Sequence, residues 1–184
     1  MRLFIGYTPP SDILEKLEEW TLPLRRADFP FRFLKNPVVH LTLHFLGKVD
    51  ASRQKALTDS LETELADIGK FPIHIDELGA FSRNGSVSIL WAGVKSDKRL
   101  SDLHRLLGRS IGKVGLPLED RPFSPHITLA RPRSDAGRIP VSQLSPYLSA
   151  KPHLECLFDH LTLFSSELSP QGARYRKQKE FRFE

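Results

Sequence analysis

The sequence predicts an α+β fold with two similar lobes whose sheets face each other, and three observations support this prediction. Segments with apolar residues at helical spacing alternate with short strand-like segments along the chain. The pattern H-x-T-x begins at His40 and again at His126, a separation of 126 − 40 = 86 residues that is close to half the chain length. With 184 residues, 40% of them hydrophobic, the chain is long enough for one domain, or two small lobes, around one core.

Residues 1–94 are predicted to form two helices among five strands. Ser11 or Asp12 is expected to cap the first helix, and Asp50 follows a turn into the second. Asn84-Gly85 is a strong signal for a hairpin between the last two strands. The predicted strands are 2–9, 31–35, 38–47, 71–81 and 86–94, and the predicted helices are 11–24 and 51–69.

The second half of the chain repeats this plan. A third helix is predicted to end at Gly115, and the alternating tail at 174–183 should pair with its neighbour. The other predicted elements are a helix beginning at 97, a strand at 125–132, a short helix or turn at 142–149, and a long strand or pair of strands at 153–168.

Charge and cysteine content narrow the class of protein. The net charge is +5 and the isoelectric point is near 9.5, which favours anionic partners such as nucleic acid or phosphorylated small molecules. Cys156 is the single cysteine, so neither an intramolecular disulfide nor a cysteine zinc site is predicted. The opening "MRLFIG" is far shorter than a signal peptide or a membrane span of roughly 20 residues. We expect a soluble, unexported, cytoplasmic protein without a membrane partner.

The two H-x-T-x patterns indicate a reactive site. On a strand, residues i and i+2 point the same way, about 7 Å apart, so histidine and threonine share one face while the residue between them points into the core. An approximate two-fold axis between the halves would bring His40, Thr42, His126 and Thr128 into one cleft. Two imidazoles with pKa values near 6.5 can then act as an acid and a base, and the hydroxyls can bind phosphate oxygens. Such a site needs no metal.

The segments "HLTLHFLG" and "RPFSPHITLAR" resemble the paired signatures of the 2H phosphoesterase superfamily. They are most similar to the bacterial and archaeal RNA 2′,3′-cyclic phosphodiesterases, once named 2′-5′ RNA ligases. The resemblance covers nearly the whole chain, because "RLFIGYTPP", "GAFSRNGSVSILWAGV" and "LTLFSSELSPQGARYRKQKEF" also stand where that family has similar segments.

The resemblance implies a single two-lobed domain over residues 1–184, with a central cleft between two antiparallel sheets and helices outside. It implies hydrolysis of RNA 2′,3′-cyclic phosphodiester ends to 2′-phosphomonoesters, without metal or cofactor, by an expected monomer. His40 is assigned as the acid and His126 as the base, and the near symmetry of the site leaves the reverse assignment open. Thr42 and Thr128 would hold the non-bridging oxygens as charge builds on them.

Three further residues are candidates for substrate binding. Arg131, at the end of the second motif's strand, matches an arginine of the family and can clamp a phosphate. Tyr175 and Phe123 can stack on a base or form the wall of the cleft, and core packing accounts for either residue equally well.

The remaining histidines are expected to be structural or exposed. His160 and Thr162 form a third H-x-T-x only 160 − 126 = 34 residues after His126, so the symmetry supplies no partner for them. His40 and His44 would lie about 13 Å apart on a strand, too far for one zinc ion. Alternation puts His44 on the face of His40 and Thr42, where two positions are open: the edge of the cleft, or the exposed surface, which we expect. His104 has no motif context.

Two other classes of function remain open at this point. Within enzymes, the alternatives are other 2H specificities: cyclic ADP-ribose-type phosphates, 2′-5′ oligoadenylates, or the reverse ligation of RNA ends. Outside enzymes, the protein could bind RNA ends without catalysis, although intact histidine and threonine in both motifs argue against a pure binder.

Overall fold

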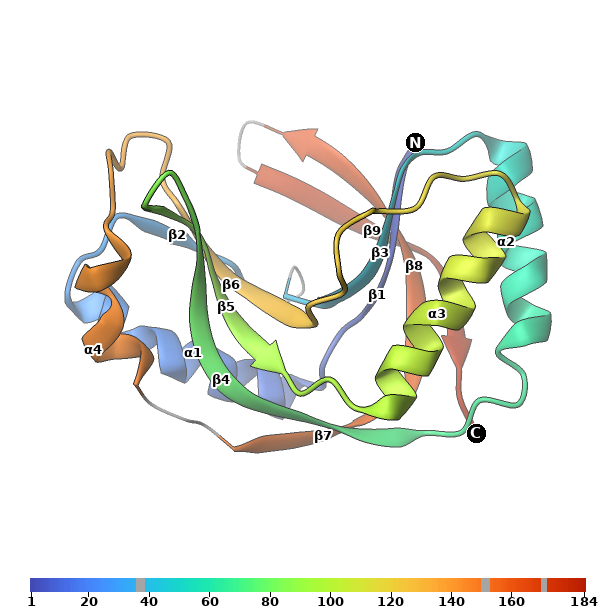
Figure 1. Cartoon of the computed structure of the whole chain (residues 1–184), viewed down its shortest axis with the longest axis horizontal. Coiled ribbons are helices and arrows are strands. Elements are labelled where there is room, and N and C mark those ends of the chain that lie inside the picture. Colours follow the sequence, from blue (N-terminus) through green and yellow to red (C-terminus); the bar gives the residue numbers. More distant parts are fainter. Residues whose placement is uncertain (36–38, 150–152, 170–171) are drawn as a thin grey trace.

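The computed structural model describes residues 1–35, 39–149, 153–169 and 172–184, and its elements follow the predicted order (Figure 1). The helices are α1 Ser11–Arg26, α2 Ala51–Glu64, α3 Lys98–Lys113 and α4 Ser145–Leu148, with a 3-10 helix, η1, at Val141–Gln143. The strands are β1 Arg2–Tyr7, β2 Phe31–Phe33, β3 Leu41–Lys48, β4 Phe71–Arg83, β5 Ser86–Val94, β6 His126–Pro132, β7 Leu154–Phe158, β8 His160–Ser169 and β9 Gly172–Arg182. Val38, predicted to begin a strand, lies outside the described residues.

The strands pair antiparallel throughout, and the predicted α+β class is confirmed. The described residues form nine strands in the order β7-β4-β5-β6-β3-β1-β8-β9, with β2 paired to β6. The two expected sheets are hydrogen-bonded into one path, because β3 and β6 share the residue pair Leu41 and Ile127. The tail pairs with its neighbour as predicted, β9 with β8.

Each lobe is built from both halves of the sequence. One lobe contains β3, β1, β8 and β9, so strands from the two ends of the chain lie side by side in it. The other contains β7, β4, β5 and β6 together with β2. Figure 1 shows α2 and α3 beside the first lobe and α1 and α4 beside the second. The periodicity of apolar residues predicts helices and strands but not which strands pair. It therefore does not reveal that each lobe contains strands from both halves of the chain.

The capping residue of α1 and the end of α2 differ from the prediction. The N-cap of α1 is Pro10, not Ser11 or Asp12, and no side chain hydrogen-bonds at this cap. Asp12 lies in the first turn, where its carboxylate interacts favourably with the helix dipole. α2 ends at Glu64 instead of residue 69, because the chain turns there and the Ile68 amide donates to the carbonyl three residues back, at 3.1 Å.

Helix α3 supports the lobe that carries the first motif. Its buried stripe, Leu100, Leu103, Leu107 and Ile111, is part of the same core as Leu41 of β3. Burying each such side chain contributes about 1.5 to 3 kcal/mol. The Asp97 carboxylate caps the helix by accepting a hydrogen bond from the Leu100 amide at 2.8 Å. This lobe is therefore a rigid support for residues near the start of β3.

We predict that Gly6→Ala destabilises the protein near the first motif. Gly6 lies opposite Thr42 in the β1–β3 register, and a Cβ there would be 2.7 Å from the Leu41 carbonyl oxygen. Relieving this clash requires backbone movement, which should lower the free energy of unfolding by about 1 to 3 kcal/mol in a urea titration.

The matched control is Gly112→Ala, inside α3. A Cβ at Gly112 would meet no atom of the described residues within 4 Å. Higher helix propensity should therefore raise the free energy of unfolding by about 1 kcal/mol. If Gly6→Ala were as stable as the wild type, the close approach of β1 to β3 would be disproved.

Candidate active site

The two motifs meet where β3 and β6 pair. Leu41 and Ile127, the middle residues of the two H-x-T sequences, form this pair, and both side chains are fully buried. In an antiparallel register of this kind, the histidine of each motif lies across from the threonine of the other. All four of these side chains are half-buried and line one cleft of about 1020 Å³: His40, Thr42, His126 and Thr128.

A β-bulge follows the threonine of the first motif. One step along β1, from Gly6 to Ile5, corresponds to two steps along β3, from Thr42 to His44. Leu43 is therefore the extra residue, and the alternation of faces shifts by one position beyond it. Directly after the extra residue, His44 is buried and lines one end of the cleft.

The second motif contains the same irregularity at the same place. One step along β5, from Trp91 to Leu90, corresponds to two steps along β6, from Thr128 to Ala130. Leu129 is the extra residue here. Each bulge turns the side chain three positions after the threonine toward the cleft, which is Phe45 on β3 and Arg131 on β6.

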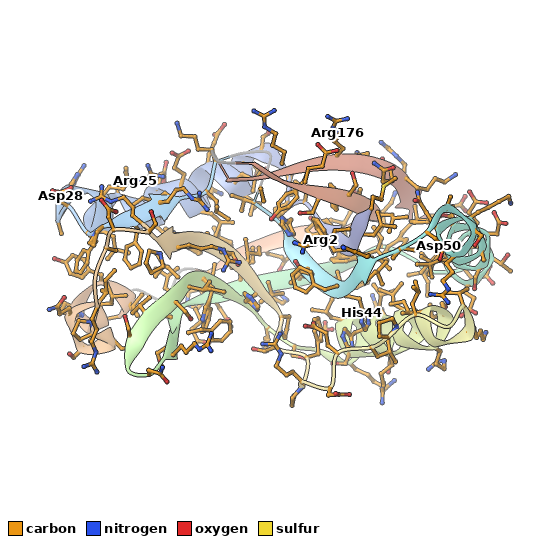
Figure 2. All side chains as sticks on the ribbon, turned by 90° about the horizontal axis from the view of Figure 1, so that it is seen from above. Arg2, Arg25, Asp28, His44, Asp50 and Arg176 are labelled. Carbon is orange, nitrogen blue, oxygen red and sulfur yellow. The ribbon has the colours of Figure 1, made fainter. Side chains whose placement is uncertain are left out.

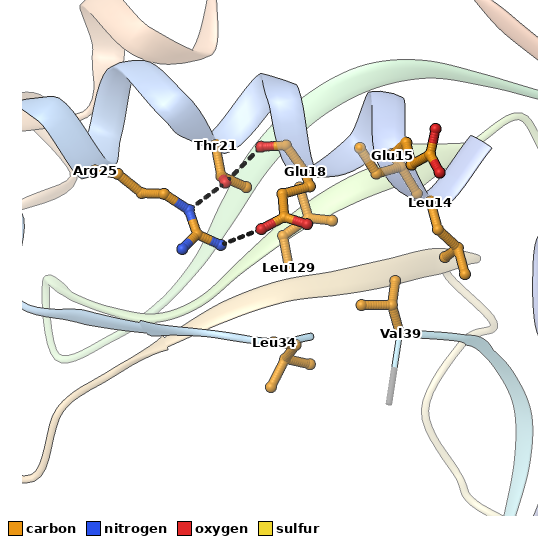
Figure 3. Close-up of a pocket in the computed structure, with 9 residues that line it drawn as sticks. Leu14, Glu15, Glu18, Thr21, Arg25, Leu34, Val39 and Leu129 are labelled. Atoms are coloured by element: carbon orange, nitrogen blue, oxygen red, sulfur yellow. Dashed lines mark hydrogen bonds and ion pairs between the residues drawn. The ribbon is translucent and has the colours of Figure 1, made fainter. Parts of the chain in front are cut away.

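Helix α1 packs against residues next to both motifs. A hollow of about 90 Å³ lies beneath this helix, and its lining includes Leu14, Leu129 of the second bulge, and Val39, which directly precedes His40 (Figure 3). On the helix, the Arg25 guanidinium lies 3.5 Å from the Glu18 carboxylate and also donates to the Thr21 hydroxyl at 2.9 Å. One rigid helix thus contacts the chain on either side of the pairing between the motifs.

His126 is held in a defined orientation. Its Nδ1 donates a hydrogen bond to the Ser124 carbonyl oxygen at 2.7 Å, which leaves Nε2 available for proton exchange. The Phe81 ring meets the imidazole edge-on, with centroids 4.9 Å apart, and the Trp91 ring lies 6.4 Å away. These contacts limit the rotation of the imidazole in the cleft.

His40 lies among aromatic side chains. Phe4 stacks on the imidazole with centroids 4.7 Å apart, and Tyr175 meets it edge-on at 5.1 Å. Phe164 completes the group at 6.0 Å. The apolar residue Phe4 on β1 therefore fixes the first histidine.

The three predicted binding residues also line the cleft. Arg131 is exposed, whereas Tyr175 and Phe123 are half-buried. Burial raises the pKa of the Tyr175 hydroxyl, and Arg131 and Arg32 partly oppose this rise. One face of Phe123 is covered by the His104 ring, with centroids 3.9 Å apart.

The prediction of a surface position for His44 is wrong, whereas the alternative that it lines the edge of the cleft agrees with the structure. The bulge turns His44 toward α3, where it is 6% exposed and donates from Nε2 to the His104 carbonyl oxygen at 2.9 Å (Figure 2). Its ring stacks on that of His104, with centroids 4.0 Å apart. His44, His104 and Phe123 therefore form a column of three rings at one end of the cleft.

The third H-x-T-x copy lies elsewhere. The His160 Nδ1 is 2.6 Å from the Asp159 carboxylate, and its ring packs against Tyr7. Thr162 is fully buried, and its hydroxyl has no hydrogen-bond partner among the described residues. Neither side chain is among the described residues that line the cleft. This placement supports a structural role for His160.

Comparison with known proteins identifies the family. The family profile described as the 2′-5′ RNA ligase superfamily matches residues 9–169. The RNA 2′,3′-cyclic phosphodiesterase of Thermotoga maritima is 27% identical over 100% of this chain and 96% of its own. That of Thermus thermophilus is 32% identical over 98% of this chain and 89% of its own. The crystal structure of E. coli LigT complexed with 3′-AMP has a TM-score of 0.76 and 28% identity, over 99% of this chain and 97% of LigT.

The chain belongs to the 2′-5′ RNA ligase superfamily. The resemblance of its motifs to the 2H phosphoesterases is thereby confirmed, and so is the fold.

Several residues in or beside the cleft of this chain were not found by sequence reasoning. Phe4, Phe81 and His104 hold the motif histidines or their loop, and Arg32 lies beside Arg131. In the sequence, Phe4 and Phe81 cannot be distinguished from the other apolar residues of predicted strands. The sequence "FRF" predicts that Arg32 points to the opposite face of its strand from the two phenylalanines. Only the pairing of β2 with β6 shows that Arg32 lies beside Arg131.

The described residues contain no group of three or more His, Cys, Asp or Glu side chains placed to hold a metal ion. None of the helices described is both long and apolar enough to cross a membrane.

We predict that acid weakens the stack of His44 on His104. Burial, and secondarily His44, lowers the pKa of His104 from 6.5 to about 4, and burial also lowers the pKa of His44. Because these folded-state pKa values lie below the unfolded ones, the stabilisation is complete above pH 6.5 and is lost as the pH falls toward 4. The midpoint of urea unfolding should decrease over this window.

His104→Phe provides the control, because it keeps a ring against Phe123 but cannot be protonated. Its urea midpoint should fall less than that of the wild type between neutral pH and the folded-state pKa of His104. Parallel declines in the two proteins would show that His104 does not contribute to the acid sensitivity.

Proposed function

We propose that the protein hydrolyses RNA 2′,3′-cyclic phosphate ends to 2′-phosphomonoesters. The observation that carries this proposal is the pairing of Leu41 with Ile127, which brings two histidines and two threonines into one cleft. The superfamily membership and the relatives named RNA 2′,3′-cyclic phosphodiesterase support the same reaction.

In this mechanism, water attacks phosphorus in line with the 3′ oxygen. A bond forms between the water oxygen and phosphorus, the bond from phosphorus to the 3′ oxygen breaks, and the phosphate stays on the 2′ oxygen. Nε2 of His126 takes the proton from water, and His40 gives a proton to the 3′ oxygen. Both histidines then return to their starting states by proton exchange with solvent.

The orientation of His126 favours its role as the base. Because Nδ1 donates to the Ser124 carbonyl, the neutral ring has its lone pair on Nε2, where a base must accept a proton. Thr42 and Thr128 donate hydrogen bonds to the non-bridging oxygens as negative charge builds on them. The acid, the base and the oxygen-binding groups are all protein side chains, so the mechanism requires no metal.

The cleft suits an anionic nucleotide. Four arginines and one lysine line it, and a single carboxylate does so among the described residues. These side chains are Arg32, Lys35, Arg83, Arg121, Arg131 and Glu119. E. coli LigT, whose structure holds 3′-AMP, shows that a relative with this fold binds a nucleotide.

We predict that His40→Ala and His126→Ala each lower turnover by at least about 10²-fold, the usual contribution of a positioned proton-transfer group. Since the two residues act as one unit, the double variant should be little worse than either single one. The wild-type pH profile should be bell-shaped, and each single variant should lose one limb. Turnover of an oligonucleotide ending in a 2′,3′-cyclic phosphate provides the measurement.

His160→Ala is the matched control, because His160 occupies the same tetrapeptide outside the cleft. Its turnover should stay near that of the wild type, while its stability falls through loss of the contacts with Asp159 and Tyr7. The assignment of the motifs is wrong if folded His160→Ala is inactive while His40→Ala or His126→Ala remains active. A binder without catalytic function would instead keep its RNA affinity in all three variants and show no turnover in the wild type.

A further inference from the structure

The second motif lies beside an indole ring that covers two glycines. In the sheet, Trp91 of β5 is the direct partner of Thr128 on one side and of Gly79 on the other. Gly93, two residues further along β5, is the partner of His126. Partners in an antiparallel register carry their side chains on the same face, so Trp91 shares the face of His126 and Thr128. Both glycines adjoin Trp91 on this face without a side chain of their own.

The indole occupies the space that side chains at both glycines would need. A Cβ at Gly79 would overlap Cζ2 and Cη2 of Trp91 and lie 2.8 Å from Cε2, and a Cβ at Gly93 would lie 3.0 Å from Cζ3. Neither glycine has a positive φ, so the backbone conformation there is open to any residue. Glycine is needed at these two positions because the ring lies against the backbone of β4 and β5.

Trp91 and Phe81 form an aromatic cluster with the His126 imidazole. The Phe81 centroid is 5.3 Å from that of Trp91 and 4.9 Å from that of His126, and the last two are 6.4 Å apart. Edge-on contacts between rings contribute about 0.5 to 1.5 kcal/mol each and depend on the angle between them. The imidazole also donates from Nδ1 to the Ser124 carbonyl oxygen. The hydrogen bond fixes one nitrogen and the two rings limit the tilt about it, so Nε2 is held in one direction.

The indole N–H shows that Trp91 is held by its shape. Nε1 is buried and has no hydrogen-bond partner among the described residues. Leaving a buried donor unpaired costs about 1 to 3 kcal/mol, a cost that phenylalanine would avoid. What Trp91 contributes is therefore the large flat surface of its ring.

We propose that Trp91 is a positioning residue for His126, and that Gly79 and Gly93 make room for its indole. This inference rests on the proposed function, in which Nε2 of His126 takes the proton from water. A displacement of about 1 Å in a reacting group can cost about 10²-fold in rate. Trp91 is not among the described residues that line the cleft, so its loss should lower kcat and leave KM nearly unchanged.

The test displaces the ring by adding one methyl group beneath it. Gly79→Ala places a Cβ where Cζ2 and Cη2 of Trp91 lie, so the indole must shift. On an oligonucleotide ending in a 2′,3′-cyclic phosphate, kcat should fall by about 10- to 100-fold while KM changes by less than about 2-fold. Trp91→Leu should lower kcat by a similar factor. Trp91→Phe keeps a flat ring and should retain more turnover than Trp91→Leu.

The double variant separates positioning from general damage. Once Trp91→Leu has removed the indole, Gly79→Ala has no ring to displace, so the double variant should turn over no more slowly than Trp91→Leu alone. Its urea midpoint should exceed that of Gly79→Ala, because the clash is relieved. If Gly79→Ala alone is too unstable to assay, Trp91→Leu and Trp91→Phe still provide the test.

Val87→Ala is the matched control on the same strand. Val87 is 4% exposed and precedes Trp91 by 91 − 87 = 4 residues, so removing its methyl groups destabilises β5 without moving the indole. In the folded protein, the kcat of this variant should equal that of the wild type.

The outcomes separate this inference from the proposed function. If the wild type does not hydrolyse the oligonucleotide, the proposed function fails and this inference fails with it. If the wild type is active but folded Trp91→Leu keeps the wild-type kcat, the positioning role is wrong while the proposed function stands. The same conclusion follows if the losses in Gly79→Ala and Trp91→Leu multiply in the double variant, or if Val87→Ala loses as much kcat as they do.

Discussion

The pairing of Leu41 with Ile127 is the constraint on which the cleft depends. It joins a four-stranded array and a five-stranded array into one hydrogen-bonded sheet, and its two side chains are fully buried on the side away from the cleft. In a strand, burying the middle residue of H-x-T forces its two neighbours to the opposite face. Burial of two aliphatic side chains therefore presents two histidines and two threonines to the same volume. The apolar core and the reactive face are consequences of a single register.

Two β-bulges and one helix refine this arrangement. The extra residues, Leu43 and Leu129, follow the two threonines. Beyond each of them, the alternation of side chains between the two faces of the strand is shifted by one residue. The β6 bulge brings Arg131 into the cleft, where it meets Arg32. Helix α1 packs on Leu129 and on Val39, so it contacts both motifs from the rear. Bulges next to active sites commonly redirect a side chain, and here they occur symmetrically in both motifs.

Much of this could be predicted from the sequence, and the failures have physical causes. Periodicity predicted the order of the elements, and spacing predicted that His40 and His126 meet, because both depend on local alternation and approximate symmetry. The burial of His44 against α3 was not predicted, since a bulge adds one residue without any change in composition. The pairing of Arg32 with Arg131 and the packing of Phe4 on His40 arise from contacts between segments far apart in the chain, which periodicity does not encode.

The central claim is that the paired motifs open a cyclic phosphate because one histidine takes a proton from water and the other gives a proton to the leaving oxygen. The most direct measurement incubates an oligonucleotide ending in a 2′,3′-cyclic phosphate with the protein in EDTA and identifies the product by phosphorus NMR. The account predicts complete conversion to the 2′-phosphomonoester at an undiminished rate. A 3′-phosphomonoester, or turnover that stops in EDTA and returns with added zinc or magnesium, would contradict it.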